Sequence, residues 1–230
     1  MKKLIILILL LYLPYHASAL NMALLTGGGT SYIATETFET SEYDNATCGT
    51  PICVTENDQT CDGDTDTTGL DMVGDKCLTV GGDALGQWWL DFGNYNEIYI
   101  TVKFRYNDNP VADVIPFTIN DSSDNPLCSI QVQPDENIYI LAYGGSWVQH
   151  TNIAPDTSTY IRLRYTIGTG DNAACGISVW TGSEWATEYV SDDGTRTAQA
   201  YRLECQNNND TILNYFDDIK VNNENIKNPE

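Results

Sequence analysis

Strict alternation of apolar and polar side chains is the feature of this sequence that most constrains its fold. Residues Glu97–Tyr106 place an apolar side chain at every second position, and residues Tyr160–Ile167 repeat the pattern. A period of two with many β-branched and aromatic residues predicts a half-buried β-strand. The positions that face outward on these two strands hold four cations: Lys103, Arg105, Arg162 and Arg164.

Shorter runs of the same kind recur along the chain and are separated by turn residues. Gly, Asn, Asp and Pro cluster between them, as in Asp108-Asn109-Pro110 and Gly144-Gly145. Short strands divided at regular intervals by such turns predict an all-β fold, an antiparallel β-sandwich jelly-roll of two packed sheets. The weaker strands are expected near Trp88–Phe92, Pro116–Asn120, Leu127–Val132, Ile138–Tyr143, Gly176–Thr181, Gln199–Cys205 and Tyr215–Val221. The stretch 45–75 shows no convincing alternation, so we expect one long loop there.

The N-terminus predicts export from the cytoplasm. Lys2 and Lys3 precede an apolar run that ends at Pro14, and Ala17-Ser18-Ala19 supplies small residues three apart. This is the pattern of a secretory signal peptide over 1–19, and the run is too short to span a bilayer. We therefore expect a secreted or cell-surface protein without membrane insertion, in which 20–35 form an N-terminal lead segment.

The composition is strongly acidic. Removing residues 1–19 leaves nine Lys and Arg against 32 Asp and Glu, a formal charge of −23. Such a chain repels nucleic acid, so no nucleic-acid partner is expected, and it suits divalent or cationic partners. Simple solvation of an extracellular surface is the simpler explanation of the charge. The remaining length fits one large β domain.

Seven cysteines follow the signal peptide, which for an exported chain predicts disulfides with one cysteine left over. Cys48 and Cys53 flank a Gly and a Pro, as a local loop staple would, and Cys61 and Cys77 can close the next loop. Two of the three later cysteines can pair across the sandwich, and the sequence leaves open which two. These three lie on predicted strands: Cys128, Cys175 and Cys205.

The last predicted strand carries an acid where alternation expects an apolar residue. In Tyr215–Val221 the alternation puts Asp217 on the same side as Ile219, toward the core. A buried carboxylate is costly unless it is hydrogen-bonded, paired or bound to a metal. Near the other end, Glu39 follows Phe38, again an acid beside an apolar anchor. The two ends could pair as neighbouring strands and share one cation.

These two ends resemble jelly-roll carbohydrate-binding modules and laminin-G-like domains of the concanavalin A-like superfamily. The similar elements are the Phe38-Glu39 pair, the closing segment FDDIKV and the middle segment TYIRLRYTIGTGDNAACGISVWTGSEW. The resemblance covers residues 36–222 and leaves 223–230 as a C-terminal tail. It implies a structural calcium ion held by the equivalents of Glu39 and Asp217, with oxygen ligands of the kind calcium prefers. The alternative is that Asp217 accepts hydrogen bonds from backbone N–H groups without a metal.

Known catalytic patterns of this superfamily do not appear. The E-x-D-x-x-E spacing of its hydrolases and the R-x-E-x-R and Q-I-H elements of its lyases are missing from the sequence. His150 is the one histidine after the signal peptide, and a lone histidine after a Gly-Gly turn is more often a surface residue than a base. The acids of Asp62-Gly63-Asp64-Thr65-Asp66 begin like a calcium loop, but the EF-hand Gly and Glu are replaced by Thr67 and Val73. We expect an exposed acidic loop there.

Exposed aromatic residues favour carbohydrate binding instead, because sugars present flat apolar faces ringed by hydroxyl groups. Adjacent Trp88 and Trp89 must face opposite sides of their strand, and Trp185 falls in a predicted loop. The outward arginines predict either an anionic ligand or cross-strand ion pairs, of which ion pairs are the simpler explanation. Packing at the core or rim is the alternative for any single aromatic residue. The predicted ligand-binding residues are Tyr143, Trp147, His150, Arg162, Arg164 and Trp180.

Together these patterns predict a secreted, non-catalytic domain that recognises an extracellular glycan. The first alternative is a structural or adhesive subunit that self-associates through the odd cysteine or the sheet edges. A polysaccharide lyase or glycoside hydrolase is the third hypothesis. It ranks last because the known catalytic patterns are missing and a fold alone does not confer chemistry.

Overall fold

The computed structural model describes residues 32–38, 53–55, 60–66, 70–74, 76–81, 86–169, 173–192, 195–207 and 212–229, all within the single compact unit 31–230. No helix occurs among these residues, and none is therefore long and apolar enough to cross a membrane. The strands are β1 (Ala34–Glu36), β2 (Cys53–Thr55), β3 (Thr60–Asp66), β4 (Lys76–Gly81), β5 (Gly86–Tyr95), β6 (Glu97–Tyr106), β7 (Val114–Asn120), β8 (Pro126–Val132), β9 (Asn137–Ala142), β10 (Val148–Asn152), β11 (Thr159–Thr166), β12 (Ala174–Val179), β13 (Tyr189–Asp192), β14 (Ala200–Asn207) and β15 (Leu213–Asn222).

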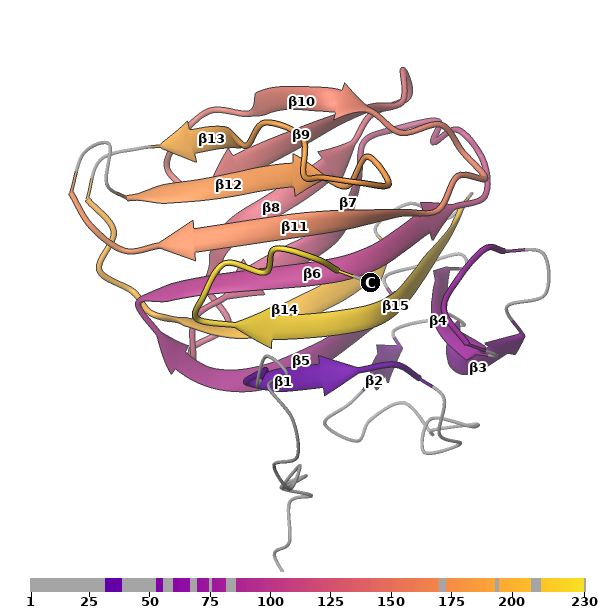
Figure 1. Cartoon of the computed structure of the whole chain (residues 1–230), viewed down its shortest axis with the longest axis horizontal. Coiled ribbons are helices and arrows are strands. Elements are labelled where there is room, and N and C mark those ends of the chain that lie inside the picture. Colours follow the sequence, from indigo (N-terminus) through magenta and orange to yellow (C-terminus); the bar gives the residue numbers. More distant parts are fainter. Residues whose placement is uncertain are drawn as a thin grey trace, which may run out of the picture. The chain divides into compact units, whose positions relative to one another are not determined.

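The strands form two antiparallel sheets. An eight-stranded sheet has the order β13-β12-β11-β6-β15-β4-β3, with β1 also pairing with β15. A seven-stranded sheet has the order β10-β9-β8-β7-β14-β5-β2. In Figure 1 one sheet is seen in front of the other, and β6, β11 and β15 lie over strands of the seven-stranded sheet. The predicted antiparallel β-sandwich is confirmed.

The core lies between the sheets and is built from the apolar half of each alternation. In β6 the side chains of Ile98, Ile100 and Val102 are buried, as the period of two requires. Phe104 packs at 5.0 Å from Phe117 of the other sheet, and Phe117 packs at 5.1 Å from Phe216, each edge to face. Burying one such side chain contributes about 1.5–3 kcal/mol, so this cluster is a main source of stability.

Most strands lie where the alternation predicts them. Strand β6 has the predicted bounds, β11 begins one residue earlier than predicted, and Trp88 is buried while Trp89 is partly exposed. The long loop predicted for 45–75 is wrong in part, because β2 and β3 lie inside it. Strand β3 pairs with β4 and β2 pairs with β5. The acidic segment 62–66 shows no alternation that would predict a strand. It forms one because its backbone pairs with that of β4.

The chain ends pair as predicted, although one residue faces the other way. In the β1–β15 pair Ala34 lies opposite Val221, and Glu36 lies opposite Ile219. The register of β15 against β6 shifts between Asp217 and Lys220, where Asp218 has a φ of 43°. This bulge reverses the alternation, so Asp217 faces the same side as its partner Lys103, away from the core.

Several predicted residues fall outside the described part of the chain. These are the signal peptide over 1–19, most of the lead segment 20–35, and the residues Glu39 and Cys48. Cys53 and Cys61 lie on described strands, but their side chains are not described. Cys77, Cys128, Cys175 and Cys205 are buried, and the last three are thiols in this structure. The predicted disulfides therefore stay predictions.

Candidate functional site

The outward surface of the seven-stranded sheet carries an unusual row of buried polar side chains. In β7, Phe117 and Ile119 enter the core, so Thr118 and Asn120 face outward. In β8, Ser129 faces outward between core residues. These outward side chains are nonetheless almost inaccessible, at 4% for Thr118, 4% for Asn120 and 1% for Ser129. We call this surface the polar face; its members are Trp89, Asp91, Thr118, Asn120, Ser129, Gln131, Tyr139, Tyr143, Arg202, Glu204 and Gln206.

A chain of hydrogen bonds crosses the polar face from strand to strand. The amide of Gln206 donates to the Thr118 hydroxyl at 3.1 Å, and the hydroxyls of Thr118 and Ser129 lie 2.9 Å apart. The Ser129 hydroxyl in turn donates to the Tyr143 hydroxyl at 3.3 Å. Hydrogen bonding of this kind fixes hydroxyl and amide groups from β14, β7, β8 and the end of β9 in one line. Tyr143 stands at the exposed end of that line, 39% accessible.

Beside this line, Glu204 and Asn120 form a second polar pair. The Asn120 amide nitrogen donates to the Glu204 carboxylate at 2.8 Å. Burial raises the pKa of Glu204, against the opposing effects of the Asn120 hydrogen bond and the Arg202 charge. Within the described part of the chain, the buried Asn120 Oδ1 has no hydrogen-bond donor. A buried acceptor without a donor is costly, so an additional donor at this atom would be favourable.

A charged group borders the pair. Arg202 forks between the carboxylates of Asp91 and Asp124, and its guanidinium lies over the Trp89 ring at 4.9 Å. Hydrogen bonding to Asp91 raises the pKa of Arg202. The two aspartates neutralise the cation, and the stacked ring holds it flat against the sheet.

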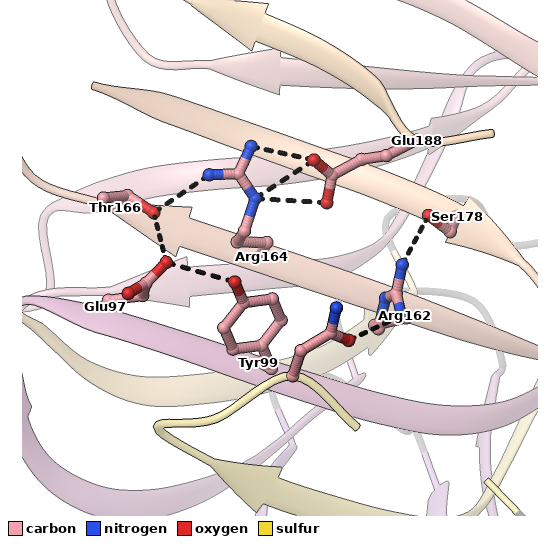
Figure 2. Close-up of polar contacts among 8 residues, drawn as sticks. Glu97, Tyr99, Arg162, Arg164, Thr166, Ser178 and Glu188 are labelled. Atoms are coloured by element: carbon pink, nitrogen blue, oxygen red, sulfur yellow. Dashed lines mark hydrogen bonds and ion pairs between the residues drawn. The ribbon is translucent and has the colours of Figure 1, made fainter. Parts of the chain in front are cut away.

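The eight-stranded sheet carries a separate polar cluster on its own outward side, shown in Figure 2. Arg164 donates to both carboxylate oxygens of Glu188, with the closest contact at 2.8 Å. Near it, the Tyr99 hydroxyl donates to Glu97 at 3.1 Å. The ion-pair interpretation of the outward arginines is thus confirmed for Arg164, and Arg105 pairs with Asp156 at 2.8 Å.

Arg162 binds the C-terminal tail. Its guanidinium donates to the Asn225 side chain at 2.7 Å, to the Ile226 carbonyl, and to the Ser178 hydroxyl at 3.1 Å. It also lies 4.7 Å from the centre of the Trp185 ring, and the indole of Trp185 donates to the same Ile226 carbonyl at 2.9 Å. Arg162 is buried at 8% exposure, so it serves chiefly to fasten the tail over the sheet.

The six predicted ligand-binding residues therefore lie in three places. Arg162, Arg164 and Trp180 belong to the eight-stranded sheet, where Trp180 packs edge to face on Trp185 at 5.3 Å. Trp147 and His150 lie at β10, and the His150 ring lies 4.6 Å from Tyr189 of β13. Burial lowers the pKa of His150. Of the six, Tyr143 alone lies on the polar face.

Sequence reasoning did not single out Asn120, Ser129 or Glu204. The alternation that predicts their strands already places them outward, and this was the available signal. The alternation does not show which strands are neighbours. In the sheet β14 lies between β7 and β5, and this brings Glu204 beside Asn120.

Asp217 is the described half of the predicted calcium pair. Its carboxylate is fully buried and accepts hydrogen bonds from the backbone N–H groups of Val73 and Asp218, both at 2.7 Å. The described residues hold no cluster of three or more His, Cys, Asp or Glu that could bind a metal. Both carboxylate oxygens of Asp217 accept a backbone N–H, which is the arrangement that the metal-free alternative predicts.

Comparison with known proteins gives structural relatives but no sequence relatives. No family model and no curated protein matches this chain. The cellulose-induced protein Cip1 superposes with a TM-score of 0.60 at 10% identity, over 84% of this chain and 98% of Cip1. An endo-β-1,4-glucuronan lyase from the fungus Trichoderma reesei gives a TM-score of 0.59 at 10% identity, over 87% of this chain and 99% of the lyase.

The exoplasmic/lumenal domain of VIP36, solved with Ca²⁺ and Man3GlcNAc bound, gives a TM-score of 0.51 at 12% identity, over 80% of this chain and 88% of that domain. This chain also matches a sialidase but spans only 20% of its length. Cip1, the lyase and the VIP36 domain share the fold of this chain over most of its length. At these identities the likeness shows the fold alone.

Proposed function

We propose that this chain is a secreted, non-catalytic member of the concanavalin A-like superfamily that binds an extracellular glycan on its polar face. The observation that carries the proposal is the buried line of hydroxyl and amide groups, together with the buried Asn120 Oδ1 that has no donor among the described residues. A sugar ring offers several hydroxyl donors and acceptors at fixed spacing. A preorganised row of such groups binds it without first having to be ordered.

The charge of the polar face favours a neutral glycan over a polyuronate. Arg202 is already neutralised by Asp91 and Asp124, and Glu204 adds another carboxyl group nearby. A polyanion would also be repelled by the secreted chain, whose formal charge without residues 1–19 is −23, from nine Lys and Arg against 32 Asp and Glu. The structural relatives named for a glucuronan lyase and for a Man3GlcNAc-bound domain support a carbohydrate ligand in general.

Binding to neutral oligosaccharides by the wild type and two variants tests the proposal. We expect Asn120→Ala and Tyr143→Ala to weaken binding at least tenfold, about 1.4 kcal/mol for each lost hydrogen-bonding or stacking contact. Tyr189→Ala is the matched control for the polar face, because Tyr189 is similarly exposed at 42% but lies on the other sheet. Because Tyr189 contacts His150, loss of binding in both Tyr189→Ala and His150→Ala would place the ligand beside β10. Trp180→Ala and His150→Ala test the other two places where predicted residues lie.

Two outcomes would redirect the proposal. Binding lost in Trp180→Ala or His150→Ala and kept in Tyr143→Ala would place the ligand elsewhere than on the polar face. If the protein binds no glycan, the proposed function is wrong, and the self-associating surface subunit is favoured. That alternative predicts oligomers in mass measurements made under non-reducing conditions.

Catalysis is the second candidate, and Glu204 is the observation that favours it. A half-buried carboxyl group of raised pKa is the type of group that hydrolases use as a general acid. Its test is product formation: release of new reducing ends from a bound glycan, abolished by Glu204→Gln, would replace the binding function with an enzymatic one. Binding without products would support the non-catalytic proposal.

We also propose export and a structural calcium ion. The signal-peptide pattern supports cleavage after Ala19, which N-terminal sequencing of the exported protein would check. Glu39 and Asp217 are the proposed calcium ligands. The buried Asp217 carboxylate supports the second ligand, and calcium would tie the two chain ends together where β1 pairs with β15.

A further inference from the structure

Two buried cysteines of opposing sheets meet inside the sandwich. Cys128 belongs to β8 and Cys175 to β12, which passes in front of β8 in Figure 1. Both side chains are at most 2% exposed. Burial, and then the nearby Cys175 thiol, raise the pKa of the Cys128 thiol, so the two side chains are close enough to interact. The Cys175 Sγ also lies 3.4 Å from the carbonyl oxygen of Leu127, the residue that precedes Cys128.

The strands beside these cysteines bring the two sheets unusually close. Cys128 is in register with Ala142 of β9, and Cys175 is in register with Ser191 of β13. The Ala142 backbone N–H donates to the Ser191 hydroxyl at 3.0 Å, which bonds the two sheets directly at this level. Packed sheets ordinarily lie about 10 Å apart, so two cysteines can be bridged across them only where their Cα atoms come within about 7 Å. Here this hydrogen bond draws together the two strand pairs that carry Cys128 and Cys175.

We propose that Cys128 and Cys175 form a disulfide that closes this edge of the sandwich when the chain folds under oxidising conditions. The two thiols together lose two protons and two electrons as one bond forms between their Sγ atoms. The electrons and protons reduce the disulfide of a thiol oxidant, such as glutathione disulfide, to two thiols. The structure thus selects one pairing from those that the sequence leaves open.

Cys205 is excluded from this pair by its position. It lies on β14 in register with Phe117 and Trp88, and it is fully buried. Burial raises the pKa of the Cys205 thiol as it does for Cys128, so the exclusion of Cys205 rests on its position alone. Cys205 therefore serves as an internal control: a buried cysteine on a strand that is not expected to be bridged to Cys128 or Cys175.

The burial of the pair also dictates how the test must be made. Thiol–disulfide exchange needs a thiolate and access, and burial raises the pKa of the Cys128 thiol. Oxidising the folded protein would therefore be slow. The full chain should instead be refolded from denaturant in a buffer of glutathione and glutathione disulfide, so that the bond forms while the cysteines are still accessible.

The refolded protein is then unfolded with iodoacetamide, without reductant, and digested with trypsin. Cleavage after Arg105, Arg162, Arg164 and Arg196 puts Cys128 in peptide 106–162 and Cys175 in peptide 165–196. We expect mass spectrometry to find these two peptides joined, and to find them separate after reduction. Recovery of both peptides separately alkylated, or of Cys128 joined to a different cysteine, would overturn the proposal.

Variants provide a second readout. Cys205→Ala should keep the joined peptides, whereas Cys175→Ala should leave Cys128 alkylated. The wild type should melt at roughly 5–10 °C higher when oxidised than when reduced. The double variant Cys128→Ala/Cys175→Ala should lose most of that difference. An equal difference in the double variant would contradict a disulfide at this pair.

Discussion

At the scale of single residues, Glu204 links the polar face to the pH dependence of stability. Burial raises its pKa above the ordinary value of 4.5, so between the two values the folded protein keeps a proton that the unfolded chain releases. The free energy of unfolding therefore falls as pH rises through this window and recovers as pH falls. Glu204→Gln keeps the hydrogen bond from Asn120 but cannot ionise. We expect this variant to be more stable than the wild type at pH 7–8 and less sensitive to pH.

Urea unfolding of both proteins between pH 5 and pH 8 checks this expectation. Glu184→Gln is the matched control, because it makes the same substitution at an exposed position. Its stability should follow the wild type across the range. Parallel pH profiles for wild type and Glu204→Gln would mean that Glu204 ionises in the folded protein as readily as in the unfolded chain.

At the scale of elements, the C-terminal tail and β11 stabilise each other through Arg162. The guanidinium holds Asn225 and Ile226, and Trp185 holds Ile226 a second time. We expect Arg162→Met to lower the free energy of unfolding by about 2 kcal/mol, the order of one or two hydrogen bonds to a charged group. Deleting residues 224–230 should lower it by a similar amount. The two changes together should cost less than their sum, because they remove the same contacts.

A double-mutant cycle in urea measures this coupling. Arg202→Met provides the comparison, since Arg202 lies on the other sheet and contacts Asp91 and Asp124 instead of the tail. Its effect should add to that of the deletion. Full additivity for Arg162 as well would show that the tail does not depend on this side chain.

The same elements show what the sequence can and cannot predict. Strand β6 was predictable to its bounds because one side of it meets the core and the other does not. Strand β3 was missed because its partner β4 stabilises it, and its own residues Thr60–Asp66 carry no alternation. The bulge at Asp218 reverses the facing of Asp217, and no local pattern signals it. The polar face required knowledge of which distant strands lie side by side.

At the scale of the whole molecule, charge and the proposed calcium site make separable predictions. The chain has 32 acidic and 11 basic side chains, so its folded form repels itself, and salt should raise the melting temperature by screening. A bound ion should add to this effect because it stabilises only the folded state. We therefore expect CaCl2 to raise the melting temperature more than NaCl or MgCl2 at equal ionic strength, and a chelator to remove the difference.

Asp217→Asn separates the two contributions. An asparagine can still accept the hydrogen bonds from Val73 and Asp218, but it removes the charge that would hold the ion. This variant should keep the increase caused by NaCl and lose the additional increase caused by calcium. Asp124→Asn, at an exposed carboxylate on the other sheet, should keep both. If calcium, magnesium and sodium act alike on the wild type, the buried Asp217 carboxylate is held by backbone hydrogen bonds without a metal.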